Sequence, residues 1–214
     1  MTGWALGCGI AVGVLLVSIA REQGMLAAIA KVAASACMVL AATTGGALEH
    51  PSGRLVTLGL CLSAAGDVFL IGRGRLAFLA GLVAFALAHV AYVAACLAMG
   101  VAMGTGVAAA AGLTLVALRV WRWLSPHVPA AMRWPVRGYI VVITAMVACA
   151  LGAWTRGAPA GLPLGAVLFF LSDLSVARER FVVSSTLNRF WGLPAYYAGQ
   201  LLIASAVVLP PALA

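Results

Sequence analysis

Residues 76–118 read LAFLAGLVAFALAHVAYVAACLAMGVAMGTGVAAAAGLTLVAL, without a single Lys, Arg, Asp or Glu. A helix needs about 20 apolar residues to cross the hydrocarbon core of a bilayer, so this run is long enough for two crossings. Gly100, Gly104 and Gly106 interrupt it near the middle, and glycine tolerates the backbone angles of a helix end. The stretch therefore predicts two membrane-spanning helices joined by a turn at these glycines.

The rest of the chain has the same apolar character. Hydrophobic residues make up 64% of the 214 residues and charged residues 8%, whereas soluble domains carry about 25% charged residues. The mean hydropathy of +1.12 also excludes a soluble fold. Breaks at arginine, proline and glycine predict an all-α bundle of eight transmembrane helices in a single domain, residues 1–214. The predicted spans are approximately 4–20, 25–44, 55–72, 76–98, 104–124, 136–155, 162–177 and 191–209.

The first apolar stretch resembles a signal peptide in length. It has no basic segment in front of it, however, and Arg21 follows the apolar run instead of preceding it. These features favour a retained first span.

The arginines are distributed unevenly between the predicted loops. Loops after odd-numbered spans hold Arg21, Arg73, Arg75, Arg119, Arg122, Arg133, Arg137, Arg178, Arg180 and Arg189, and the opposite side holds only Arg54 and Arg156. Because Arg-rich loops stay in the cytoplasm, both termini are predicted to lie outside. We expect an integral protein of a bacterial inner membrane, whose net charge of +8 meets anionic lipid headgroups and not nucleic acid.

Asp67 and Asp173 are the two aspartates of the chain, and both lie inside predicted spans. Ionisable groups in hydrocarbon are costly, so each is a candidate functional residue. Asp67 precedes Arg73 and Asp173 precedes Arg178 by a similar separation, which puts both carboxyls roughly 8–9 Å from the cytoplasmic interface at about 1.5 Å per residue. This shared depth predicts a common cavity that opens to the cytoplasmic leaflet. The alternative is that each aspartate pairs with its own downstream arginine.

Further polar residues fall within the predicted spans. Tyr196 and Gln200 share one helical face, and His89 and Tyr92 share another, because they are three or four residues apart. Structural roles remain open, since a lone intramembrane histidine often forms an interhelical hydrogen bond and tyrosines anchor at interfaces. The candidate binding residues are Lys31, His89, Tyr92, Tyr196, Tyr197 and Gln200.

Metal and nucleophilic catalysis have no support in the sequence. His50 and His127 are predicted in loops on opposite sides of the membrane, so they cannot complete a three-histidine zinc site with His89. No Gly-x-Ser-x-Gly motif occurs, and no cysteine is paired with a histidine. Two carboxyls at one site, however, can divide the work of an acid and a base. That division suits hydrolysis of an ether-like bond or a peptide.

In their order along the chain, these residues resemble the YhhN family of membrane proteins, which includes lysoplasmalogenases. The similarity covers most of the chain, although Val32 stands where the family often has proline. The segments that carry it are Lys31, residues 66–70, residues 78–81, Phe85, residues 88–92, Pro135, Val136, Tyr139, Met146, residues 165–173 and residues 196–203.

The resemblance implies hydrolysis of the vinyl ether bond of a lysoplasmalogen to a fatty aldehyde and glycerophospho-ethanolamine or -choline, with no cofactor and no metal. It implies that Asp67 and Asp173 are catalytic and adds Tyr139 to the substrate-binding residues. Arg73, Arg178 and Arg180 suit the phosphate of a lipid headgroup.

Two other functions fit the intramembrane charges. A small proton-coupled transporter could use the buried Asp and Lys residues, although the outer halves of the spans carry almost no charge. An intramembrane aspartyl protease also has a Gly-Asp sequence within a span, but its Tyr-Asp partner and Pro-Ala-Leu segment are missing here. The sequence leaves the oligomeric state open.

Overall fold

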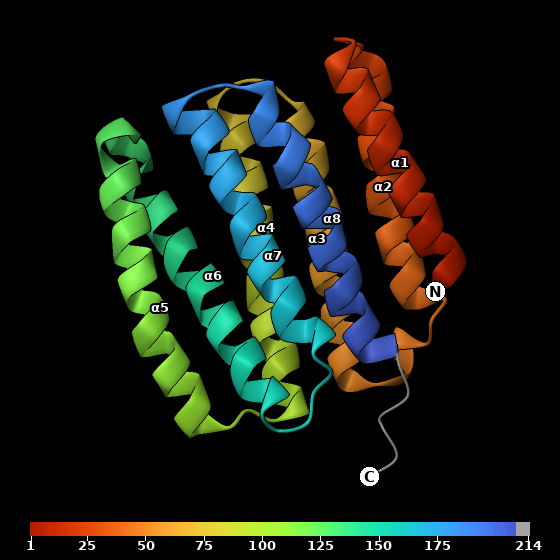
Figure 1. Ribbon diagram of the computed structural model, residues 1–214, viewed down its shortest axis with the longest axis vertical. Coiled ribbons are helices and arrows are strands. Elements are labelled where there is room, and N and C mark those ends of the chain that lie inside the picture. Colours follow the sequence, from red (N-terminus) through yellow and green to blue (C-terminus); the bar gives the residue numbers. More distant parts are fainter. Residues whose placement is uncertain (209–214) are drawn as a thin grey trace.

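The computed structural model describes residues 1–208, which form eight α-helices and no strand. The helices run alternately in opposite directions, so that α1 begins and α8 ends at the same end of the bundle (Figure 1). The eight helices are α1 (Thr2–Ala20), α2 (Gly24–Thr43), α3 (Pro51–Ile71), α4 (Arg75–Met99), α5 (Met103–Leu124), α6 (Arg133–Trp154), α7 (Gly161–Ala177) and α8 (Thr186–Val208). The prediction of an all-α bundle of eight helices is confirmed.

The long uncharged run forms α4 and α5. The chain turns at Gly100, whose φ of 88° lies in a region that residues with a side chain rarely adopt. Gly104 and Gly106 do not belong to this turn, contrary to the prediction, because α5 already begins at Met103. Helix α8 begins at Thr186, earlier than the predicted residue 191, and the predicted end at residue 209 lies outside the described residues.

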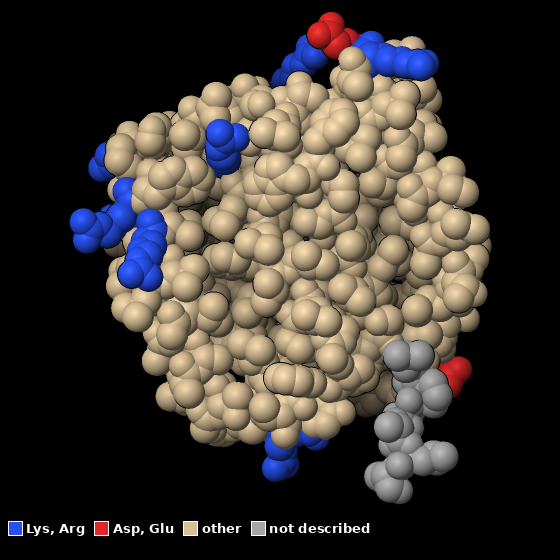
Figure 2. Space-filling view, in the orientation of Figure 1, with Lys and Arg blue, Asp and Glu red and all other residues tan. Residues whose placement is uncertain are grey.

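The surface of the bundle suits a membrane. By length and composition, 7 helices could cross a bilayer, and the described part of α8 is not among them. In Figure 2 the charged side chains lie toward the edge of the visible face, most of them at the top and the upper left, and the centre of this face is apolar. Arg156 belongs to the end that holds the start of α1, and most of the other arginines belong to the opposite end, which we call the arginine-rich end. The distribution indicates a membrane protein.

Two helix pairs approach closely through glycine. In α7 and α8, a Cβ atom on Gly165 would lie 2.5 Å from the carbonyl oxygen of Gly199. In α3 and α4, Gly59 makes room for the ring of Tyr92 and Gly66 for the ring of Phe85. Small residues of this kind let membrane helices pack backbone against backbone.

The polar interior is enclosed by α2, α3, α4, α6, α7 and α8. Helix α5 lies at the periphery and packs mainly against α6, with Leu124 its one buried residue. Helix α1 packs against α2 and α8 and contributes mainly apolar side chains. A small second core beneath the connection from α5 to α6 consists of Phe78, Leu124, Val128, Met132 and Val136.

Candidate active site

The carboxylate of Asp67, on α3, is buried among donors from α2 and α8. Its Oδ2 atom accepts hydrogen bonds from Ser35 Oγ at 2.6 Å and from the Tyr196 hydroxyl at 2.8 Å. Its Oδ1 atom lies 3.2 Å from the Nζ atom of Lys31. The Tyr197 hydroxyl donates to the carbonyl oxygen of Lys31 and lies 3.1 Å from Ser35 Oγ. We call these five residues the Asp67 cluster.

The carboxylate of Asp173, on α7, has partners from α4 and α6. Its Oδ2 atom accepts a hydrogen bond of 2.7 Å from the Tyr139 hydroxyl and lies 3.3 Å from His89 Nε2. The same histidine nitrogen is 2.9 Å from the Tyr139 hydroxyl, so the three polar atoms form a triangle. His89 Nδ1 faces the sulfur of Met146 at 3.2 Å. These four residues are the Asp173 cluster.

One aromatic ring contacts both clusters. Phe169 is fully buried, and its ring centroid lies 5.3 Å from that of Tyr196 and 4.5 Å from that of His89. Among the described residues, no hydrogen bond joins Asp67 directly to Asp173. The two carboxylates therefore belong to separate hydrogen-bonded clusters, each of which has one ring against Phe169.

The arginines near the aspartates have other partners. In the described part of the chain, Asp67 pairs with a lysine and Asp173 with a histidine, so the alternative of an arginine partner for each aspartate is wrong. Arg178 donates a hydrogen bond to Asn188, and Arg180 lies over the ring of Phe78 at 4.7 Å. Arg73 is exposed at the arginine-rich end.

A third polar layer lies one helical turn farther from the arginine-rich end. The Tyr92 hydroxyl donates a hydrogen bond of 2.7 Å to Gln200 Oε1. Both residues are fully buried, as is Ser63 beside them on α3. We call Ser63, Tyr92 and Gln200 the deep layer. The polar residues proposed from the sequence thus fall into three groups.

Four residues in or beside these groups were not among the sequence candidates. Ser35 could have been found, because it lies four residues after Lys31 and shares its helical face. Ser63 stands in the same relation to Asp67. Met146 and Phe169 were noted only as part of the family resemblance, since an apolar residue in an apolar span gives no signal of its own.

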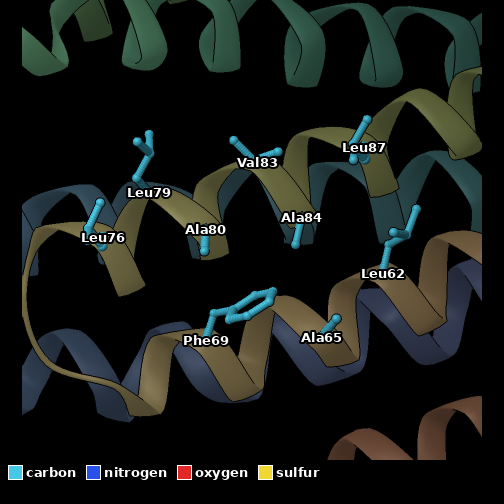
Figure 3. A pocket seen from close by; sticks show the side chains of 9 residues that line it. All are labelled: Leu62, Ala65, Phe69, Leu76, Leu79, Ala80, Val83, Ala84 and Leu87. Atoms are coloured by element: carbon cyan, nitrogen blue, oxygen red, sulfur yellow. The ribbon is translucent and has the colours of Figure 1, made fainter.

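An apolar groove on the surface lies away from both clusters. It has a volume of about 500 Å³ and lies between α3 and α4 (Figure 3). Asp67 lies two residues from both Ala65 and Phe69, so it points to the opposite side of α3. The groove therefore does not lead to the aspartates. It is lined by Leu62, Ala65, Phe69, Leu76, Leu79, Ala80, Val83, Ala84 and Leu87.

Access to the carboxylates differs between the clusters. The side chain of Asp67 is 3% exposed, whereas those of Lys31 and Asp173 are 15% and 17% exposed. The Asp67 cluster thus reaches the surface through Lys31, and the Asp173 cluster through Asp173 and the half-buried Tyr139. The predicted cavity that converges on both aspartates from the cytoplasmic leaflet stays a prediction.

The other two histidines lie at opposite ends of the bundle. His50 immediately precedes α3, and His127 belongs to the connection between α5 and α6. Within residues 1–208, no group of three or more His, Cys, Asp or Glu side chains is placed to hold a metal ion.

The helical bundle and its buried carboxylate clusters define a polytopic membrane protein with a polar site inside the apolar core. The model of the YhhN family matches residues 26–207, and the chain belongs to this family. The resemblance found in the sequence is therefore confirmed.

Curated relatives carry one enzyme name. The chain is 31% identical to "Lysoplasmalogenase TMEM86A" of Bos taurus and 32% identical to that of Homo sapiens, in each case over 79% of this chain and 72% of the relative. It is 35% identical to "Lysoplasmalogenase" of Mycobacterium bovis, over 95% of this chain and 80% of the relative. No solved structure matches the chain significantly.

Proposed function

We propose that this chain is a lysoplasmalogenase-like hydrolase that cleaves the vinyl ether bond of a single-chain alkenyl phospholipid. The observation that carries the proposal is the pair of carboxylates, Asp67 and Asp173, held in adjacent polar clusters inside an apolar bundle. The names of the relatives support the substrate class. The products are a fatty aldehyde and glycerophospho-ethanolamine or -choline.

Hydrolysis of a vinyl ether needs one acid and one base. A proton is added to the double-bond carbon remote from oxygen, which leaves an oxocarbenium ion. Water adds to the carbon of that ion and loses a proton, and the hemiacetal then breaks its bond to the glycerol oxygen. One carboxylic acid supplies the first proton, and one carboxylate stabilises the cation and accepts the proton of water. Neither a metal nor a nucleotide takes part.

The surrounding residues hold the carboxylates in fixed orientations. Tyr196 and Ser35 donate to Asp67, and Tyr139 donates to Asp173. Oriented dipoles in a site shielded from water stabilise developing charge more strongly than solvent does. This arrangement favours an oxocarbenium ion located near Phe169, between the clusters.

In the membrane, all eight helices span the bilayer, with both termini outside and the arginine-rich end in the cytoplasm. The lipid enters from the cytoplasmic leaflet and keeps its phosphate near exposed arginines. Arg73 and Arg180 are exposed at this end and suit that role. Arg178 is the weaker candidate of the three, because Asn188 already binds its guanidinium group.

The direct test is incubation of the purified protein with lysoplasmalogen, followed by measurement of released aldehyde. The matched control substrate is the saturated alkyl ether of the same length and headgroup, which has no double bond to protonate. We expect aldehyde from the first substrate and no cleavage of the second. No aldehyde above the rate of a protein-free sample would contradict the proposed function.

A further inference from the structure

Two buried polar atoms of the deep layer have no partner. Among the described residues, Ser63 Oγ and Gln200 Nε2 form no hydrogen bond, although both side chains are 0% exposed. Reversal of the Gln200 amide would not remove the problem, because only one end of the amide can face the Tyr92 hydroxyl. Buried polar groups are nearly always paired, and buried water typically bridges about three otherwise unpaired groups.

The deep layer is assembled from three helices at one level. Tyr92 follows His89 by one turn of α4, Gln200 follows Tyr196 by one turn of α8, and Ser63 precedes Asp67 by one turn of α3. The absence of a side chain at Gly59 lets the Tyr92 ring lie directly against α3. Ser63 lies one turn after Gly59, on the face of α3 that this ring contacts, and the Tyr92 hydroxyl donates to Gln200 Oε1.

This layer borders the Asp67 cluster. Ser63 and Asp67 share one face of α3, because they are four residues apart. Gln200 shares one face of α8 with Tyr196, whose hydroxyl donates to Asp67. Asp173 instead contacts His89 and Tyr139. A small molecule held by Ser63 and Gln200 is therefore a neighbour of Asp67.

We infer that Ser63, Tyr92 and Gln200 bind the water molecule that the hydrolysis consumes, and that Asp67 is the carboxylate that takes its proton. The inference rests on the proposed function, because a vinyl ether hydrolase must deliver one water molecule to an apolar site. Ser63 and the Gln200 amide donate or accept the bonds that orient this water, and Tyr92 holds the amide.

The chemical step balances within the site. Asp173 donates its proton to the remote vinyl carbon, and the oxocarbenium ion forms. The water oxygen then bonds to the oxocarbenium carbon while its proton passes to the Asp67 carboxylate. The hemiacetal gives its hydroxyl proton to the glycerol oxygen as that carbon–oxygen bond breaks, and solvent returns the proton from Asp67 to Asp173.

Methanol tests the inference, because it competes with water for the same cation. Capture by methanol gives a stable mixed acetal whose mass exceeds that of the substrate by one methanol, whereas capture by water gives aldehyde. Their ratio at a fixed methanol concentration reports how selectively the site holds water. The ratio is independent of how much of the enzyme is folded.

The test variants are Ser63→Ala and Gln200→Met, and Ser18→Ala is the matched control. Ser18 is also buried, but it donates only to the Val14 carbonyl of its own helix, on α1. We expect the ratio of acetal to aldehyde to rise about two- to tenfold in each test variant, as for the loss of one hydrogen bond. The control should keep the wild-type ratio. If Gln200→Met does not fold, Ser63→Ala carries the test.

The possible failures are distinguishable. An unchanged ratio in the test variants, with a raised KM or a lower total rate, would assign the layer to substrate binding or packing and would overturn the inference. Release of aldehyde by the wild type would still support the proposed function in that case. A wild-type protein that forms neither product would contradict the proposed function itself, and the inference with it.

Discussion

The Asp67 and Asp173 clusters place the same side chain in two different settings. Asp67 is almost completely enclosed and faces a lysine, a serine and a tyrosine, whereas Asp173 is partly exposed and faces a histidine and a tyrosine. Helices α3 and α4 form one close pair, and α7 and α8 form another. The aspartate of α3 accepts a hydrogen bond from α8, and the aspartate of α7 contacts α4, so each aspartate has a partner in the other pair. Two carboxyls in unlike surroundings are suited to unlike roles in acid–base chemistry. Two aspartates predicted at a similar depth in the membrane can therefore have unlike surroundings.

The largest effects should come from the carboxylates themselves. Asp67→Asn and Asp173→Asn preserve shape but can neither donate a catalytic proton nor carry the balancing negative charge. Each should lower kcat by about 10²–10⁴, the range of one general acid or base. Aldehyde release measures the rate, and size-exclusion chromatography checks that the variants fold. A well-folded variant that keeps more than roughly a tenth of wild-type turnover would make its aspartate structural.

The stability of the fold should depend differently on the two clusters, because among the described residues only Asp67 has a lysine partner. Lys31→Met removes that charge and leaves Asp67 buried without it, which should destabilise the fold by about 1–3 kcal/mol, less than for a fully buried pair since Lys31 is partly exposed. Thermal unfolding in detergent measures the change. Lys31→Met combined with Asp67→Asn should recover part of the loss, and Lys31→Arg is the control. Full additivity of the two substitutions would contradict a functional ion pair.

The ion pair also shows what the sequence could predict. The apolar length of each segment predicted eight helices, and the cost of charge in hydrocarbon singled out Asp67 and Asp173, each of which lies in a polar cluster. The contacts of Asp67 with α8 and of Asp173 with α4 could not be predicted, because a single sequence does not show which helices lie side by side. The contact of α7 with α8 depends on backbone contact at Gly165 and Gly199, which no spacing rule reveals.

The two tyrosines that donate to carboxylates offer a matched pair. Tyr139→Phe and Tyr196→Phe each remove one hydroxyl, at 2.7 Å from Asp173 and 2.8 Å from Asp67. Hydrogen bonds to charged groups contribute about 1.5–3 kcal/mol, so each variant should lose about 10- to 100-fold in kcat if its full effect falls on the transition state. The loss should be larger in Tyr139→Phe, because the Tyr139 hydroxyl also lies 2.9 Å from His89 Nε2. Equal losses in both variants would remove the distinction between the clusters.

The smallest effect is expected from metal removal. Together the two clusters contain two carboxyl groups, one lysine, one histidine and several hydroxyls. The proposed proton transfers need no Lewis acid. Dialysis against a chelator should leave kcat and KM unchanged within error. Loss of activity that zinc or magnesium restores would replace the carboxylate mechanism with a metal-dependent one.

We propose that the two unlike clusters, which both contact the Phe169 ring, form one catalytic unit. The kinetics of the double variant Asp67→Asn/Asp173→Asn test it most directly, because residues that act as a unit have strongly non-additive effects. We predict that kcat for aldehyde release is scarcely lower in the double variant than in the poorer single variant. A double variant whose loss equals the product of the two single losses would show that the aspartates act independently, and would contradict the claim.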